Sequence, residues 1–278
     1  MRYNERMKII GNKNALHTPE FHKKKLRERY IRITIGVLIL IVVVGVPTFF
    51  LRQERFLIST VQVQGNEITK SEEIEKIIQN DISGDYLWLI PRSSVLLYPN
   101  NKIKNDILRQ IPRLISLNLS LTDSRTLLVT IVERKPFALY CVGEMKCFFL
   151  DQTGYIFSEA PAFSGGVYMI YSTVPVFETP LGKNLVPAND FVALSTFIKS
   201  LPALNLNPQS LLIQNGEEHL TLSSGGIIMW KASANFETLR SSLESFLSDP
   251  SFTKESKPLE KILYIDLRLG NKIFYKFK

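Results

Sequence analysis

Hydrophobic residues along the chain first gather in one unbroken run and only afterwards follow the short periods of folded domains. Ile33–Leu51 holds nineteen uncharged, mostly apolar residues. A helix of this length reaches ~28 Å, close to the ~30 Å hydrocarbon thickness of a bilayer. A cleaved signal peptide and a buried core helix are the alternatives. Because the run exceeds a signal h-region and no small-residue cleavage site precedes Arg52, the pattern predicts a retained transmembrane helix.

Residues 52–134 follow strand and helix periods in turn. Val61–Val63 alternates apolar and polar residues before a turn, which predicts a strand. Thr69 and Glu72 have the spacing of a capping box at a helix start. Further patterns predict a helical face of Ile74, Ile77 and Ile78, a second helix from Asn100 or Asn101 to Pro112, and half-buried strands over Ile115–Leu121 and Thr126–Glu133. The order is strand, helix, helix, strand, strand.

Residues 135–278 change to short strands with Gly and Asp turns. A hairpin is predicted over Phe148–Phe157, a helix from Asn189 or Asp190 to near Pro202, and another helix over Asn235–Ser248. Strands are predicted over Leu211–Ile213, His219–Leu222 and Ile227–Trp230, then over a stretch in which Leu263, Ile265, Leu267 and Leu269 share a face, and, after a Gly270–Asn271 turn, over Ile273–Phe277. These elements predict a mixed sheet with flanking helices, so the whole chain is expected to be α+β.

The charge of the chain is concentrated before the apolar run. The net charge is +8, but residues 1–32 carry ten Lys or Arg against three Glu, which leaves twenty-four basic and twenty-three acidic residues elsewhere. The positive-inside bias places this head in the cytoplasm and the remainder outside. Anionic lipid is a sufficient partner for a juxtamembrane basic segment, so nucleic-acid binding is not expected.

Candidate catalytic chemistry is sparse beyond the span. His219 is the only histidine there, and the sequence has no nucleophile elbow, Gly-rich phosphate loop or zinc-ligand spacing. The paired carboxylates Glu72–Glu73 and Glu217–Glu218 are interpreted as ordinary exposed charges. We therefore expect no enzyme activity, no cofactor, no metal and no small-molecule substrate.

Two cysteines lie six positions apart. Cys141 and Cys147 flank a segment consistent with a tight turn between two strands, in a compartment that can be oxidising. A cross-hairpin disulfide and a pair of free buried thiols both remain open. A disulfide closing so short a loop would stabilise the fold by about 2 kcal/mol on the chain-entropy estimate. It would reinforce the fold locally and would not act as a redox centre.

Three motifs follow one another along the chain. Glu133–Ala138 reads E-R-K-P-F-A, Asp151–Phe157 reads D-Q-T-G-Y-I-F, and Tyr264–Arg268 reads Y-I-D-L-R. They are similar to the E-R-x-P-x-A, D-x-x-G-x-x-F and I-D-L-R motifs of the bacterial divisome family FtsQ, called DivIB in other lineages. With the basic head and single span, the resemblance covers nearly the entire chain. It implies a cytoplasmic tail (1–32), a transmembrane helix (33–51), a POTRA domain of βααββ order (52–134) and a β domain (135–278).

The resemblance also implies a function. Members of this family are single-pass proteins of the cytoplasmic membrane that bind other division proteins at the septum, and the FtsB–FtsL coiled-coil pair is captured by strand addition near the C-terminal edge. By position after I-D-L-R, the implied partner-binding residues are Leu269, Gly270, Ile273 and Tyr275; the alternative for Ile273 and Tyr275 is that they only pack the core. An alternative function is a POTRA-containing component of a protein export or cell-wall accessory system.

Overall fold

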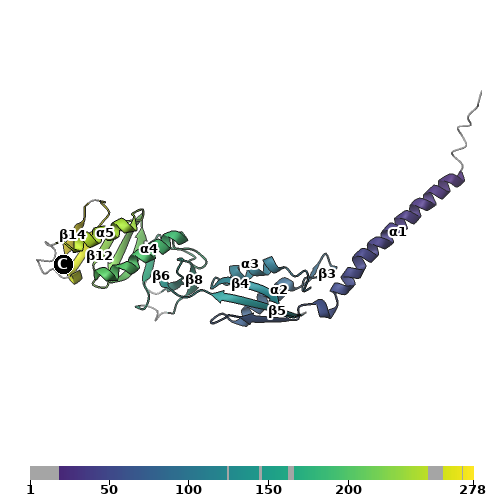
Figure 1. Cartoon of the computed structure of the whole chain (residues 1–278), viewed down its shortest axis with the longest axis horizontal. Coiled ribbons are helices and arrows are strands. Elements are labelled where there is room, and N and C mark those ends of the chain that lie inside the picture. Colours follow the sequence, from purple (N-terminus) through teal and green to yellow (C-terminus); the bar gives the residue numbers. More distant parts are fainter. Residues whose placement is uncertain (1–18, 124, 144–145, 162–165, 250–258, 271) are drawn as a thin grey trace, which may run out of the picture. The chain divides into compact units, whose positions relative to one another are not determined.

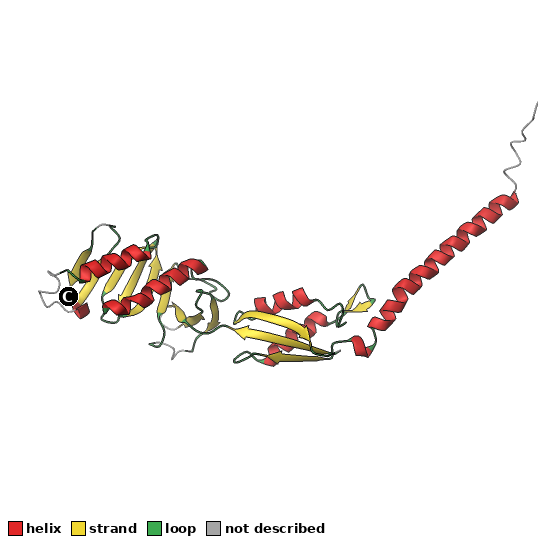
Figure 2. Ribbon diagram, viewed as in Figure 1, coloured by secondary structure: helices red, strands yellow, loops and turns green. Residues whose placement is uncertain are grey.

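The fold is α+β, with one long apolar helix near the N-terminus and a large mixed sheet (Figures 1 and 2). The structure, a computed structural model, describes residues 19–123, 125–143, 146–161, 166–249, 259–270 and 272–278. Residues 1–18 of the basic head lie outside these ranges, as does Asn271 of the predicted Gly270–Asn271 turn. The α+β class expected from the sequence is confirmed.

Contacts between Cα atoms group the chain into two compact units. The first comprises residues 1–61, 79–99 and 121–127, and the second comprises residues 62–78, 100–120 and 128–278. A domain boundary between residues 134 and 135 stays a prediction.

The first unit contains the apolar helix. Helix α1 runs over Pro19–Leu51, so it begins well before the predicted start at Ile33, and its part from Lys23 is long and apolar enough to cross a membrane. Thr48 lies inside this helix, and its Oγ1 donates to the carbonyl of Val44 at 2.6 Å. This back-bonding satisfies the hydroxyl within the helix, which a hydrocarbon environment requires. The first unit also contains a short 3-10 helix, η1 (Glu54–Phe56), which follows α1, and, further along the chain, the two-residue strands β2 (Asp85–Tyr86) and β3 (Ile90–Pro91).

A three-stranded sheet has the order β1-β5-β4, and two helices lie between β1 and β4 in the sequence. Ile74 and Ile78 are fully buried on one helix and Ile103 and Ile107 on the other, because positions three and four apart share a helical face. The bounds are β1 Thr60–Gln64, α2 Ser71–Ile82, α3 Asn100–Gln110, β4 Leu114–Leu121 and β5 Thr126–Glu133. The elements predicted for residues 52–134 therefore exist in the predicted order.

Two local predictions in this region are wrong. Helix α2 begins at Ser71, and the amide of Thr69 donates to Glu133 at 2.8 Å, so Thr69 and Glu72 do not form a capping box. In β4, Ile115 is exposed while its neighbour Leu114 is buried, so the alternation does not start as predicted. Both errors come from contacts between distant segments: the carboxylate of Glu133 binds the amide of Thr69, and the neighbouring elements decide which side chains of β4 are covered.

The second unit contains a nine-stranded mixed sheet of order β14-β13-β12-β11-β10-β9-β6-β7-β8. The pairs β6–β9, β9–β10 and β12–β13 are parallel and the others are antiparallel. The bounds are β6 Ala138–Val142, β7 Lys146–Leu150, β8 Ile156–Glu159, β9 Ile170–Val174, β10 Pro208–Gln214, β11 Glu217–Leu222, β12 Ile227–Lys231, β13 Ile262–Asp266 and β14 Phe274–Phe277. The last strand in the chain therefore lies at one end of the sheet.

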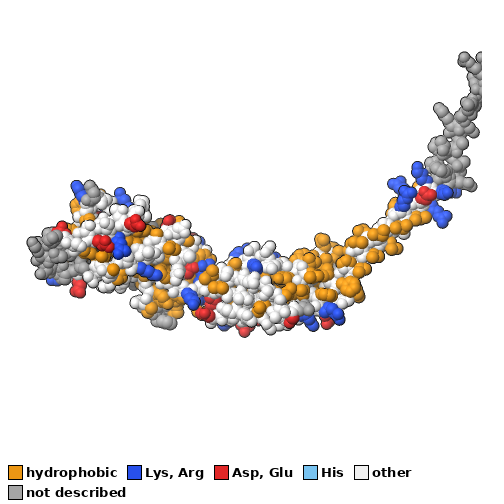
Figure 3. Space-filling view, in the orientation of Figure 1, with side chains coloured by type: hydrophobic (Ala, Val, Ile, Leu, Met, Phe, Trp, Pro, Cys, Tyr) orange, Lys and Arg blue, Asp and Glu red, His pale blue; other side chains and the backbone are white. Residues whose placement is uncertain are grey.

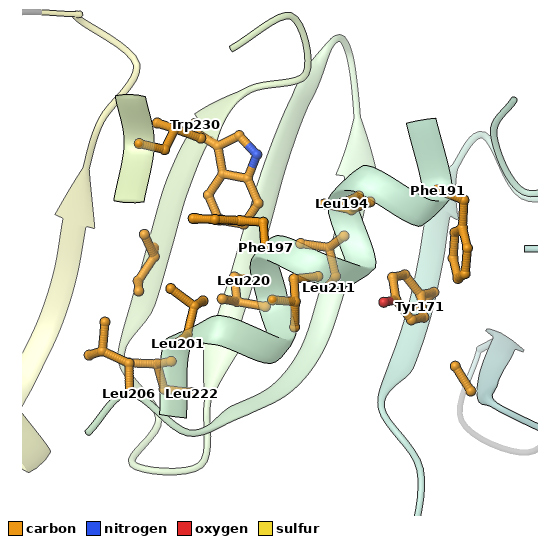
Figure 4. Packing of buried hydrophobic residues seen from close by; sticks show 14 of the residues in the cluster. Tyr171, Phe191, Leu194, Phe197, Leu201, Leu206, Leu211, Leu220, Leu222 and Trp230 are labelled. Atoms are coloured by element: carbon orange, nitrogen blue, oxygen red, sulfur yellow. The ribbon is translucent and has the colours of Figure 1, made fainter. Parts of the chain in front are cut away.

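Helices α4 (Ala188–Ser200) and α5 (Phe236–Leu247) cover one face of this sheet (Figure 2). Short 3-10 helices follow α4, as η3 (Leu201–Leu204), and precede β13, as η4 (Leu259–Lys261). Figure 4 shows the packing beneath α4, where Phe197 meets Trp230 edge to face with ring centroids 5.4 Å apart. Both rings are buried, so the core of the sheet is aromatic at this point.

Gly154 closes the turn between β7 and β8. Its φ is +79°, a conformation that favours glycine, and a Cβ there would lie 2.6 Å from the ring of Phe191. The glycine of the D-x-x-G motif is thus required both by the turn and by the approach of α4.

Candidate partner-binding edge

Strand β14 forms one edge of the nine-stranded sheet, and among the described strands its one neighbour is β13. The two pair antiparallel, with Ile265 opposite Tyr275 and Asp266 opposite Phe274. Phe274 and Tyr275 are each 47% exposed. An edge strand that carries exposed aromatic side chains is suited to pairing with a strand from another chain.

The predicted residues Ile273 and Tyr275 differ in how they are placed. Ile273 is half-buried and packs against the core of the sheet, together with Phe277. Tyr275 packs its ring against Phe246 of α5, with centroids 4.9 Å apart, yet leaves almost half of its side chain exposed. Ile273 therefore packs β14 against the core, while Tyr275 leaves part of its side chain accessible at the edge.

Leu269 and Gly270 lie in the turn between β13 and β14. Leu269 is 58% exposed, and Gly270 has a φ of +66°. Both line a pocket of about 510 Å³ between this turn and the start of α5, where Ala234, Thr238 and Leu239 form the facing wall. The pocket is large enough to accept an apolar side chain from a chain that adds to β14.

Arg268 is held by carboxylates next to this turn. Its guanidinium donates to Asp266 through Nε at 2.9 Å and Nη2 at 2.6 Å, and to Glu217 Oε2 through Nη1 at 2.9 Å. The hydrogen bonds from Arg268 lower the pKa of Asp266 below its ordinary value. The Arg of the I-D-L-R motif thus locks the end of β13 onto β11, so the turn that bears Leu269 starts from a fixed point.

The segment that forms the edge and the turn before it is rich in basic residues. Residues 267–278 contain Arg268, Lys272, Lys276 and Lys278 and no Asp or Glu. Arg268 is neutralised by Asp266 and Glu217, which leaves the three lysines as the net charge of the tail. Complementarity therefore favours a partner with acidic residues beside its pairing strand.

The prediction that Leu263, Ile265, Leu267 and Leu269 share one face is wrong. Ile265 and Leu267 are buried, whereas Leu263 is exposed and Ile262 takes the buried position. A β-bulge between Ile262 and Tyr264 is the physical reason, because one extra residue moves the following side chains to the opposite face.

The interpretation of Glu218 as an exposed charge is also wrong. Its side chain is only 5% exposed, and its carboxylate accepts a hydrogen bond from Trp230 Nε1. Burial raises the pKa of Glu218 to about 7, although the bond from Trp230 acts in the opposite direction. Period-two spacing was the missed signal, since Glu218 shares its face of β11 with the buried Leu220 and Leu222.

Cys141 and Cys147 form a disulfide across the β6–β7 hairpin, where they are directly opposed.

His219 is the one histidine beyond the span. Its Nδ1 lies 3.4 Å from Gln214 Nε2, and its Nε2 lies 3.2 Å from Glu217 Oε2. In the described part of the chain, no group of three or more His, Cys, Asp or Glu residues could hold a metal ion.

The first two motifs meet in space. Glu133 accepts amide hydrogen bonds from Glu67, Ile68 and Thr69, and these outweigh the effect of burial, so the pKa of Glu133 is lowered. Its neighbour Arg134 forms an ion pair with Asp151, the first residue of the D-x-x-G turn. Both motifs are thus composed of residues that hold the backbone at the end of β5 and the start of the larger sheet.

No protein-family model matches the chain, and no curated protein matches it. The resemblance to FtsQ and DivIB therefore stays a prediction from the three motifs and their order in the sequence.

Proposed function

We propose that this chain is a non-catalytic scaffold of bacterial cell division that captures coiled-coil partners of the FtsB and FtsL type by strand addition at β14. The observation that carries the proposal is the position of β14 at the sheet edge with Phe274 and Tyr275 exposed. Strand addition supplies affinity through main-chain hydrogen bonds, and pockets for alternate side chains supply selectivity. The pocket beside Leu269 is one such feature.

Helix α1 supports a membrane anchor in this proposal. Its length and composition suit one span, and the basic residues before it favour a cytoplasmic N-terminus. The sheet and its edge then lie outside, where they link cytoplasmic assembly to septal peptidoglycan synthesis. Targeting to the septum comes from the family resemblance alone.

Truncation tests the edge. A chain that lacks residues 270–278 is expected to insert into the membrane and keep its Cys141–Cys147 disulfide, but to lose pull-down of the coiled-coil pair. Because the truncation also removes Ile273 and Phe277, which pack against the core, its Tm in detergent is measured beside the pull-down. Val174→Ala, which removes apolar surface that is 50% exposed on β9, away from the edge, should leave capture unchanged. Undiminished pull-down by the truncated chain would contradict the proposed site.

Depletion tests the cellular role. Cells that lose the protein are expected to grow as undivided filaments, and a rescuing fluorescent fusion on the cytoplasmic side should collect at midcell. Normal division with an evenly distributed fusion would instead favour an export or cell-wall accessory role.

A further inference from the structure

The hairpin Asp85–Pro91, which joins β2 to β3, ends in exposed apolar residues. Leu87 is 87% exposed and Trp88 is 90% exposed, and Leu89 beside them is also exposed. Single exposed apolar residues are ordinary, but a tryptophan at a hairpin tip flanked by two leucines forms a patch that water solvates poorly.

The backbone conformation of this tip does not favour the leucine and the tryptophan that occupy it. Leu87 and Trp88 have φ values of +49° and +61°, and the amide of Leu89 donates to the carbonyl of Tyr86 at 3.0 Å. Two successive left-handed residues make the kind of tight turn that Asn-Gly forms most readily. A leucine and a tryptophan are strained in it, so their presence indicates a role for the side chains themselves.

Arg52 holds the hairpin beside the end of α1. It directly follows Leu51, the last residue of the helix, and donates through Nη2 to the carbonyl of Trp88 at 2.8 Å and through Nε to that of Leu89 at 3.0 Å. The same guanidinium pairs with Asp85 at 3.3 Å. The tip is therefore tied to the residue at which the apolar helix ends.

The surroundings match the chemistry of a membrane interface. Phe49 and Phe50 are exposed on the last turn of α1, and the guanidinium of Arg92 lies 5.4 Å from the ring centroid of Tyr86 in the hairpin. Figure 3 shows hydrophobic side chains continuing from α1 onto the region labelled β3 in Figure 1. Aromatic residues beside arginines at the end of a span are typical of the headgroup level of a bilayer.

We infer that the Asp85–Pro91 hairpin inserts its tip, Leu87–Leu89, into the outer lipid interface next to α1. The inference rests on the proposed membrane anchoring by α1, because the anchor brings the tip to the bilayer. The occupant of the patch is lipid because the patch continues the apolar surface of the helix itself. The hairpin then gives the chain a second contact with the membrane, and Arg52 couples that contact to the span.

Tryptophan fluorescence of the full chain in phosphatidylcholine–phosphatidylglycerol vesicles tests the inference. The chain has two tryptophans, and Trp230 is buried, so subtracting the spectrum of a Trp88→Phe variant isolates Trp88. We expect a blue-shifted Trp88 emission that is quenched by lipid brominated near the headgroup and not by aqueous iodide. A Val174→Trp chain in the Trp88→Phe background is the matched control, and its added emission should be quenched by iodide.

Water-like, iodide-quenched emission from Trp88 in a chain that floats with the vesicles would overturn the inference. The same result together with crosslinking of position 88 to another protein would assign the tip to a protein partner and also overturn it. Pull-down of the coiled-coil pair by the same vesicles reports the proposed function separately, since Trp88→Phe should leave it unchanged.

Replacing the tip with a favoured turn sequence tests whether the tip is structural. A Leu87→Asn, Trp88→Gly chain in detergent is expected to keep or raise its Tm, because the strain is relieved. A lower Tm would show that the side chains pack the fold, and would overturn the inference.

Discussion

Arg134 and Asp151 form an ion pair that joins the first two sequence motifs of the chain across seventeen positions. Arg134 also donates from Nε to the carbonyl of Pro112 at 3.1 Å and stacks over the ring of Tyr155 at 4.1 Å. Asp151 accepts from the amide and hydroxyl of Thr153 at 2.8 and 2.6 Å. Burial raises the pKa of Asp151, but these hydrogen bonds outweigh it and lower the pKa below its ordinary value. The pair therefore consists of two well-satisfied charges that have little contact with water.

Removal of Arg134 should destabilise the fold. Arg134→Ala leaves the buried Asp151 carboxylate without its cation, which costs about 3 kcal/mol. For a chain of this size the loss lowers Tm by roughly 6–12 °C, measured by thermal unfolding in detergent. Arg109→Ala is the control, because Arg109 is 78% exposed in its pair with Asp106 and should matter little. Equal Tm changes in the two variants would show that the ion pair at Asp151 contributes no more to stability than the exposed pair at Asp106.

Glu218 should make stability fall as pH rises. Its folded pKa of about 7 lies above its ordinary value of 4.5, so the folded state binds the proton more tightly than the unfolded state. Stability is then greatest below about pH 4.5 as far as this group is concerned, and up to about 3 kcal/mol is lost as pH rises to 7 and beyond. In Glu218→Gln the amide oxygen still accepts a hydrogen bond from Trp230. The part of the pH dependence of the unfolding free energy that is due to Glu218 should then vanish. Unfolding of both chains at about pH 5 and about pH 8 measures it; parallel curves would contradict the assignment.

Loss of the Cys141–Cys147 disulfide should weaken the β6–β7 hairpin only moderately. The bridge closes a short loop, so the chain-entropy estimate is about 2 kcal/mol. A Cys141→Ser, Cys147→Ser chain is expected to unfold at lower denaturant and to retain pull-down of the partners, because the hairpin is not part of the β14 edge. A loss of pull-down without unfolding would give the hairpin a direct role.

Phe274 should contribute to partner capture through its exposed ring. Phe274→Ala removes an aromatic side chain that is not needed in the core, so Tm should change little while the Kd rises about tenfold. Isothermal titration with the coiled-coil pair measures the effect, with Val174→Ala as the comparison on β9. An unchanged Kd would place the partner elsewhere.

Lys276 should steer an acidic partner to the edge. Charge reversal in Lys276→Glu is expected to slow association and to weaken its dependence on salt, since an exposed charge acts mainly on the association rate. Lys76→Glu on α2 introduces the same change of charge away from the edge and should leave the rate unaltered. Association rates in stopped flow at low and high salt distinguish the two; equal effects would indicate only the net charge of the chain.

Local patterns predicted most elements because each depends on nearby residues. The apolar run at 33–51, the faces of α2 and α3, and the helix predicted from Asn235 all follow from spacing within a few positions. The exposure of Glu218 and of Leu263 was predicted wrongly. The burial of Glu218 depends on what packs against β11, and the exposure of Leu263 depends on a β-bulge.

The sequence by itself determined most of the helical and extended segments, although not β2, β3 or β9, and it also determined that one helix is long and apolar enough to span a bilayer and where positive charge gathers. Helix and strand periods and charge are properties of near neighbours, so no tertiary information is needed to read them. Only the tertiary structure decided that β14 is an edge, that Arg134 meets Asp151, and that Arg52 holds the strained tip at Trp88. Each of these depends on which distant segments pair, and that choice is made by the packing of the whole sheet and core.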